Sequence, residues 1–198
     1  MRSANGFTLV ELLIVAAILG ILAAVAVPNF MEASVRAKVA RVSSDMRAMA
    51  TAVEAYRVDC GMYPLNGVLN ADGSVQNPHL TPAGPPAHKF LWEGLTTPVA
   101  YLTAIPEDPF VEGHAAPVRE WHPLWPRYFY TNLPHFQAVM EPSPPPVIGE
   151  MMARYGKWII ASAGPNGNRL DLSRHLYYDP TNGTISDGDI VRSPLLMP

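Results

Sequence analysis

An uninterrupted apolar segment near the N-terminus limits what this chain can fold into more than any other feature of its sequence. Residues 7–30 read FTLVELLIVAAILGILAAVAVPNF, and no polar side chain lies between Leu12 and Val27. As an α-helix, this segment would be about 36 Å long at about 1.5 Å per residue, which exceeds the roughly 30 Å of a bilayer core. The segment therefore predicts a membrane-spanning helix.

The charges before the segment predict which end stays inside. Arg2 and the α-amino group precede it, and positive charge favours the cytoplasmic side, so the residues after 30 should be exported. These residues leave three interpretations open. They are a secretory signal peptide cut after the A-x-A pattern at 24–26, a plain signal anchor, and a segment that has a specific use for its acidic residue.

That acidic residue is Glu11, the one charged side chain between residues 7 and 30. A carboxylate inside a membrane costs a few kcal/mol on insertion scales, so such residues usually have a partner or a function. One interpretation is that Glu11 reaches the nearby lipid headgroups. The other needs a cation at the same depth. A cut between Gly6 and Phe7 would create one, because an α-amino group has a pKa of about 7.7–8.0.

The N-terminal residues closely resemble the signal of type IV pilins and type II secretion pseudopilins. The resemblance rests on Gly6-Phe7-Thr8-Leu9-Val10-Glu11, on the apolar run, and on Val27-Pro28-Asn29-Phe30. It implies that a prepilin peptidase removes the leader, residues 1–6, by cutting after Gly6, and methylates the new N-terminal Phe7. It also implies that Glu11 is the charged residue used in assembly. Pro28 would mark the place where the helix bends or loosens.

The helix is predicted to continue past the membrane half, residues 7–30, into an amphipathic half at 31–63. Apolar residues repeat there with alternating spacings of four and three, which places them on one helix face at period 3.5. This seam comprises Val35, Val39, Val42, Met46, Met49, Val53 and Tyr56. Gly61 and Pro64 should end the helix. We expect the seam to form the core beneath a head, with an intermolecular coiled coil as the alternative.

The predicted head covers residues 64–198 and is rich in proline and glycine. Residues 65–150 look like long irregular loops, interrupted by an apolar island before Asp108 and by a short strand at 127–131. The C-terminal sheet should occupy 157–192, with a hairpin turned at Asn182-Gly183. The fold class is therefore α+β, with a long N-terminal helix packed on a small antiparallel sheet and with long Pro-rich loops.

No motif in the sequence predicts catalysis, and we predict that the protein is not an enzyme. A Gly-rich phosphate loop, G-x-S-x-G and H-E-x-x-H are all absent. The net charge of −3 argues against a nucleic-acid partner. The single cysteine, Cys60, excludes an intramolecular disulfide, and we expect its thiol to be buried, with pairing between chains as the alternative.

Calcium is the one cofactor that the resemblance leaves open. Major pseudopilins hold Ca²⁺ in a C-terminal loop, and this chain carries Asp171, Asp187 and Asp189 among Gly and Asn residues that could present oxygen ligands. The family's loop motif is not reproduced residue by residue.

The resemblance implies a structural subunit of a type IV pilus-like filament or of a type II secretion pseudopilus. The partners would be further copies, other pseudopilins, prepilin peptidase and an inner-membrane assembly platform. The protein would begin as a single-pass protein of the bacterial inner membrane with a periplasmic head, and would then enter the filament. The alternatives are a minor subunit that caps or primes the filament, and a membrane-anchored periplasmic binding protein or enzyme.

Processing can be tested by the intact mass and N-terminal sequence of the protein recovered from its native membrane. Cleavage after Gly6 leaves 198 − 6 = 192 residues, and we expect a chain that starts at Phe7 and carries one additional methyl group. A chain that starts at Val27 would instead show ordinary secretion through the A-x-A site at 24–26.

Overall fold

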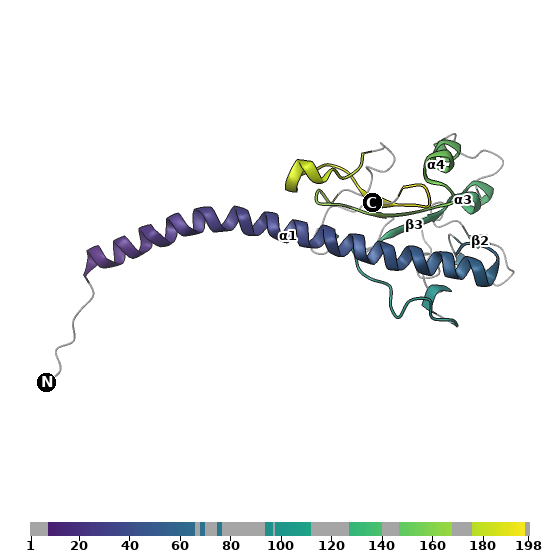
Figure 1. Ribbon diagram of the computed structural model, residues 1–198, viewed down its shortest axis with the longest axis horizontal. Coiled ribbons are helices and arrows are strands. Elements are labelled where there is room, and N and C mark those ends of the chain that lie inside the picture. Colours follow the sequence, from purple (N-terminus) through teal and green to yellow (C-terminus); the bar gives the residue numbers. More distant parts are fainter. Residues whose placement is uncertain are drawn as a thin grey trace. The chain divides into compact units, whose positions relative to one another are not determined.

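The described parts of the chain form one long helix and a small α+β head (Figure 1). The computed structural model describes residues 8–65, 68–69, 75–76, 94–96, 98–111, 127–139, 147–167 and 176–196. The elements in chain order are α1 (Leu9–Cys60), β1 (Val68–Leu69), β2 (Val75–Gln76), β3 (Phe129–Asn132), α3 (Leu133–Val139), α4 (Val147–Tyr155), β4 (Trp158–Ser162), the 3₁₀ helix η2 (Pro180–Ile185) and β5 (Ile190–Arg192). The chain divides into two compact units, residues 1–37 and 38–198.

Helix α1 confirms the predicted long helix, and it ends where the sequence indicates. Gly61 follows its last residue with a φ of +74°, a conformation that costs glycine little, and its N–H donates to the Arg57 carbonyl at 2.9 Å. Pro28 lies inside α1, and the residues on both sides of it are helical. The proline therefore removes one backbone donor without ending the helix.

The apolar seam of α1 is confirmed as core at its four central residues, while the other three seam residues are half-buried. Val42, Met46, Met49 and Val53 have no exposed surface, whereas the apolar residues of the membrane half are exposed. In Figure 1 this part of α1 runs along one face of the sheet that β3, β4 and β5 form. The seam therefore packs within the head unit, as the core interpretation predicts.

The sheet is antiparallel with the order β3-β4-β5, and its middle strand is buried on both faces. Tyr130 pairs with Ile160, and Ala161 pairs with Val191. All five residues of β4 are buried. Ile159 and Ala161 belong to the core cluster that also includes Leu133, Tyr155 and Val191, on the side of α3 and α4. A continuous apolar run is the pattern expected of a strand covered on both sides.

Helix α3 and the first four residues of α4 lie where the sequence predicted irregular loops, at 65–150, so that prediction is wrong there. Proline is well tolerated in the first turn of a helix, and α3 carries Pro134 there, while three prolines directly precede α4. The proline-rich composition therefore concealed both helices. Asn132 helps to start α3, because its side-chain oxygen accepts the His135 backbone N–H at 3.2 Å.

The predicted hairpin at Asn182-Gly183 is also wrong, because residues 180–185 form η2. The Asp179 carboxylate accepts the Thr181 backbone N–H at 2.8 Å and its hydroxyl at 2.7 Å, which caps the helix. Pro180 occupies the first turn with a fixed φ that suits a helix. This capped turn outweighs the hairpin preference of Asn-Gly. Tyr177 instead meets Asp189 in an isolated parallel bridge.

Two glycines allow the segments before β5 and after β4 to approach closely. Gly164 has a φ of +66°, and a Cβ there would collide with the Gly188 carbonyl oxygen. Gly188 has a φ of +121°, and its Cβ would lie 2.5 Å from the Tyr177 carbonyl carbon. Each position requires a positive φ and has no room for a Cβ, and only glycine meets both requirements.

Asp108 joins the loop before the sheet to the end of β4. This fully buried carboxylate accepts the Ser162 hydroxyl at 2.9 Å, the Ala163 N–H at 3.0 Å and the Phe110 N–H at 3.0 Å. Three donors from two segments therefore depend on one side chain.

We expect Asp108→Ala to lower the free energy of unfolding by roughly 2–3 kcal/mol, because it leaves buried donors without an acceptor. Urea unfolding of the full chain in detergent measures the effect. Asp59→Ala is the control, because Asp59 is exposed and accepts a single bond, from the Tyr101 hydroxyl. Equal losses for the two variants would show that Asp108 does not stabilise this junction.

Candidate functional site: the N-terminal assembly segment

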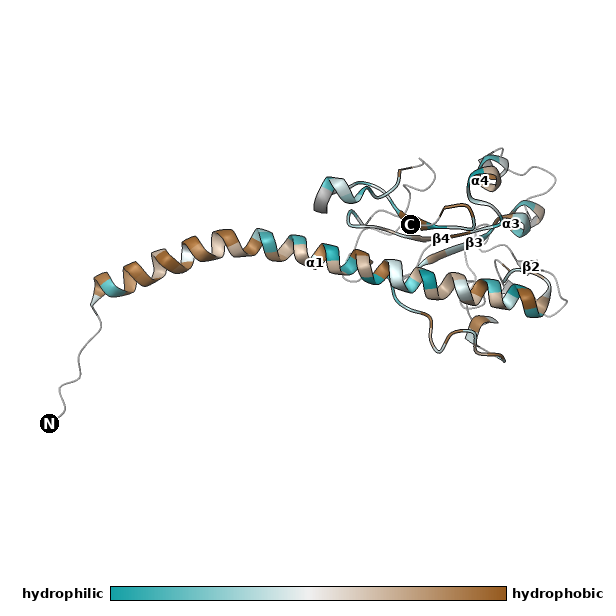
Figure 2. Ribbon diagram, viewed as in Figure 1, coloured by the Kyte–Doolittle hydropathy of each residue, from teal (hydrophilic) through white to brown (hydrophobic). Residues whose placement is uncertain are grey.

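The first half of α1 is a row of exposed apolar side chains. Leu9 is 79% exposed, Leu19 61% and Phe30 75%, and in Figure 2 the ribbon of this part of the helix is coloured mostly as hydrophobic. The helix is long and apolar enough to cross a membrane. Contiguous apolar surface of this kind marks contact with lipid or with other protein chains.

Glu11 is held at the start of this helix by Thr8. The Glu11 Oε2 atom accepts the Thr8 backbone N–H at 2.9 Å and the Thr8 hydroxyl at 2.7 Å, while the Glu11 N–H donates to the Thr8 Oγ1 atom at 3.3 Å. This reciprocal pattern is a capping box, which satisfies helix N–H groups that have no partner within the helix. The anomalous carboxylate thus has a structural partner in its own chain.

This interaction was not among the sequence predictions, although Thr8-Leu9-Val10-Glu11 carries the T-x-x-E signal before an apolar run. The capping box fixes the position of the Glu11 carboxylate. The cap keeps the carboxylate within one turn of Thr8, the second residue of the chain that cleavage after Gly6 would produce. Gly6 and Phe7 lie outside the described residues, so their processing stays a prediction.

The structure places the predicted calcium ligands in different surroundings. Asp187 is exposed and Asp189 is 2% exposed, and Gly188 separates them. The Asp189 backbone lies between Leu176 and Tyr178, with its N–H donating to the Leu176 carbonyl at 3.2 Å. Asp171 lies outside the described residues. In the part of the chain that the structure describes, no three His, Cys, Asp or Glu side chains gather in a way that could hold a metal.

Nearby acidic groups are already engaged in the fold. The hydrogen bonds from the Thr181 hydroxyl and backbone N–H lower the pKa of the Asp179 carboxyl, which serves as the cap of η2. Calcium needs six to eight oxygen ligands, and the two carboxylates beside Gly188 do not supply them. A site would require further oxygen ligands, for which Asp171 remains the predicted candidate.

Two further residues, Cys60 and Ser162, differ in exposure from what their residue types suggest. Cys60 is exposed at the end of α1, so the prediction of a buried thiol is wrong. The seam faces the sheet before this point, and Cys60 follows it on the last turn of the helix. Ser162 is buried, and its hydroxyl donates to Asp108.

The comparisons with known proteins agree at the N-terminus and extend into the head. The prokaryotic N-terminal methylation motif matches residues 1–27. The type II secretion system core protein G of Klebsiella michiganensis is 31% identical over 109 residues, which cover 55% of this chain and 70% of that protein. The chain belongs to the family of type IV pilins and type II secretion pseudopilins.

Other pilin-like relatives match this pseudopilin-family chain over shorter stretches. Core protein G of Pseudomonas aeruginosa is 44% identical over 63 residues, 32% of this chain and 44% of the relative. The type IV major fimbrial protein FimA of Dichelobacter nodosus is 50% identical over 55 residues, 28% and 35% respectively. These two matches therefore span less than half the length of each relative. No solved structure matches the chain.

Calcium binding can be measured as a change in thermal stability. If Asp171, Asp187 and Asp189 bind Ca²⁺ in the folded state only, millimolar CaCl₂ should raise the melting temperature above its value in chelator by mass action. Asp171→Asn should remove this rise, while Asp59→Asn, an exposed acid outside the loop, should keep it. An unchanged melting temperature in calcium would contradict the prediction.

Proposed function

We propose that this protein is a structural subunit of a filament, either a type IV pilus-like fibre or a type II secretion pseudopilus. Family membership supports a filament role, because the matched relatives are named as fimbrial proteins and secretion core proteins. The observation that carries the proposal is the single carboxylate, Glu11, fixed at the start of an exposed apolar helix.

The chemistry of assembly follows from that carboxylate. An uncompensated charge at membrane depth is costly, and a cation brought to the same depth offsets the cost. Prepilin peptidase would supply the cation by exposing the Phe7 amine. Each chain then carries one amine and one Glu11 carboxylate near the same end, so copies stacked side by side can pair them in a fixed order.

The exposed apolar side chains supply the remaining attraction between copies. In the membrane they face lipid, and in a filament they would face the same segments of neighbouring chains. Ala16, Gly20 and Ala24 lie four residues apart, and small residues allow helices to approach closely. Apart from its own turn of the helix, a Cβ added at Gly20 would meet no atom of the described residues within 4 Å, so another helix can approach here.

The proposal includes location and partners. The protein would be anchored in the inner membrane by α1, with its head in the periplasm, until an assembly platform moves it into the filament. Its role would be mechanical rather than catalytic. The one buried serine hydroxyl of β4 is bound to Asp108, an arrangement that serves the fold.

The test is filament formation by Glu11→Ala. We expect cleavage after Gly6 and membrane insertion to be unchanged, while the sheared filament fraction falls at least about tenfold, the factor that roughly 1.4 kcal/mol of lost pairing produces. Immunoblots of whole membranes and of sheared filaments separate these two effects.

Glu32→Ala is the matched control. Glu32 lies on the same helix beyond the apolar run, and its carboxylate is exposed and pairs with Arg36 at 3.1 Å. An exposed pair of this kind contributes little, so this variant should assemble normally. Normal assembly of Glu11→Ala would rule out charge pairing as the mechanism.

A further inference from the structure

The apolar seam does not by itself fix where the head sits along α1. A shift of seven residues moves the sheet by about 10.5 Å and returns it to the same face of a helix with a 3.5-residue repeat. Under such a shift the buried places of Val42, Met46, Met49 and Val53 would be filled by the residues at 35, 39, 42 and 46. All four are apolar, so burial at these four seam positions tolerates the slipped position.

Two polar contacts between α1 and the sheet region distinguish the observed position. The Trp158 indole N–H donates to the Glu54 Oε1 atom at 2.8 Å, and the Tyr128 hydroxyl donates to the Asp45 Oδ2 atom at 2.9 Å. Trp158 and Tyr128 are buried, so each donor needs an acceptor at that point. The two acceptors are nine residues apart, about 180° around the helix, and therefore flank the seam on opposite sides.

We propose that Asp45 and Glu54 are positioning residues that set the register of the head on α1. The charge pattern of the helix supports this assignment. A slip of seven residues towards the N-terminus would place Arg47 opposite the Trp158 N–H, since 54 − 7 = 47. It would likewise place Lys38 opposite the Tyr128 hydroxyl, since 45 − 7 = 38.

The slipped position is therefore disfavoured at each contact. A guanidinium or ammonium group can only donate hydrogen bonds, so both buried donors would lose their acceptors. The same slip would bring Asp45 to the place of Ala52, which is 2% exposed. Burying an unpaired carboxylate is costly. In the observed register each acceptor also has a cation nearby, with Arg41 at 3.7 Å from Asp45 and Arg57 at 3.5 Å from Glu54.

The opposite slip is prevented by the end of the helix. Moving the sheet seven residues towards the C-terminus would place Gly61 opposite Trp158, beyond the last helical residue, Cys60. The bonds from Tyr130 and Asn132 to the Pro64 carbonyl also favour the observed position.

The register can be measured as a distance within the full chain in detergent. The native thiol is removed by Cys60→Ser, and spin labels are placed on exposed sites by Thr51→Cys in α1 and Thr181→Cys in η2. Figure 1 shows η2, the yellow coil, on the side of the head away from the C-terminal end of α1. A slip of the sheet towards the N-terminus of α1 therefore lengthens the distance between the labels.

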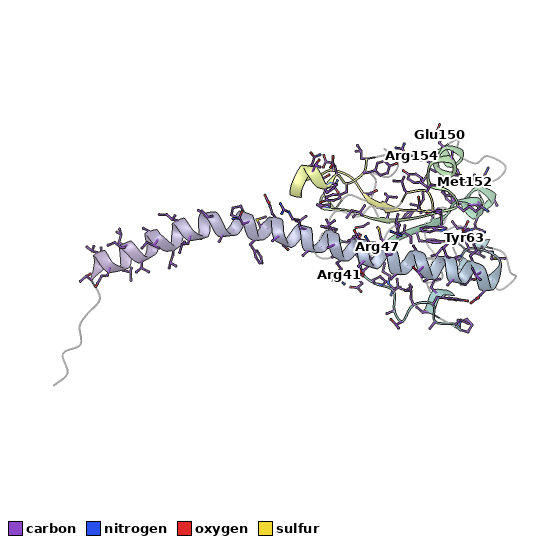
Figure 3. The ribbon with its side chains drawn as sticks, in the orientation of Figure 1. Arg41, Arg47, Tyr63, Glu150, Met152 and Arg154 are labelled. Atoms are coloured by element: carbon purple, nitrogen blue, oxygen red, sulfur yellow. The ribbon has the colours of Figure 1, made fainter. Side chains whose placement is uncertain are left out.

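The decisive variant moves both acceptors back by seven residues: Lys38→Asp, Asp45→Ala, Arg47→Glu and Glu54→Ala. Figure 3 labels Arg47 on the part of α1 that the head unit includes. We expect a second, longer distance, by at most about 10.5 Å, in addition to or instead of the original one. Asp45→Ala with Glu54→Ala alone removes the pairs without offering new ones, so it should keep the original mean distance but broaden the distribution.

Two controls make the outcome interpretable. Lys38→Asp alone tests whether a change in the label distance comes merely from losing the contact between the Lys38 ammonium and the Phe110 ring, whose centroid is 5.8 Å away. Glu32→Gln neutralises an exposed carboxylate that pairs with Arg36 of the same helix and makes no contact with the sheet among the described residues. Both should keep the single original distance. If the four-substitution chain also keeps it while folding normally, the register assignment is overturned.

If the four-substitution variant does not unfold cooperatively, the single variants Glu54→Ala and Glu54→Gln test the register proposal instead. The amide oxygen of glutamine can still accept the Trp158 N–H, so Glu54→Gln should keep the original distance distribution and Glu54→Ala should broaden it. Equal widths for the two variants would overturn the proposal. The measurement concerns one chain in detergent, so its result is independent of whether the protein forms filaments.

Discussion

A single helix that serves two environments is the constraint on which the rest of this structure depends. From Leu9 to Phe30 its apolar side chains are exposed, whereas from Val42 to Val53 the seam is buried in the head. A helix satisfies its backbone hydrogen bonds within itself, so it is stable both in lipid and beneath a sheet. Only its ends need outside partners, and Thr8 with Glu11 at one end and Gly61 at the other supply them.

The head is organised around β4, which has no exposed face. Helix α1 covers one side of β4, and α3 with α4 covers the other. The small three-stranded sheet therefore has a buried core. The polar groups brought inside by this arrangement are matched by specific acceptors, Asp108 within the head and Glu54 from α1. Each acceptor joins segments far apart in sequence, which makes the small head one cooperative body.

Sequence reasoning succeeded where a pattern repeats or a residue has few options. The seam, the helix end at Gly61 and the apolar strand at 158–162 followed from periodicity and from glycine. It failed where local signals compete. Asn182-Gly183 favours a hairpin, but the Asp179 cap and Pro180 favour η2. Proline-rich composition hid α3 and α4, because proline is compatible with a first turn. The Thr8–Glu11 capping box was legible and was overlooked.

The sequence by itself determined the apolar segment that is long enough to span a membrane, the amphipathic half of α1, the family and the α+β class, because all of these depend on local periodicity and on short motifs. The tertiary structure alone decided which side chains meet: Trp158 with Glu54, Tyr128 with Asp45, Ser162 with Asp108. These pairs are separated by 54 to 104 residues. No local pattern encodes such a pairing, since it depends on how the sheet settles on the helix.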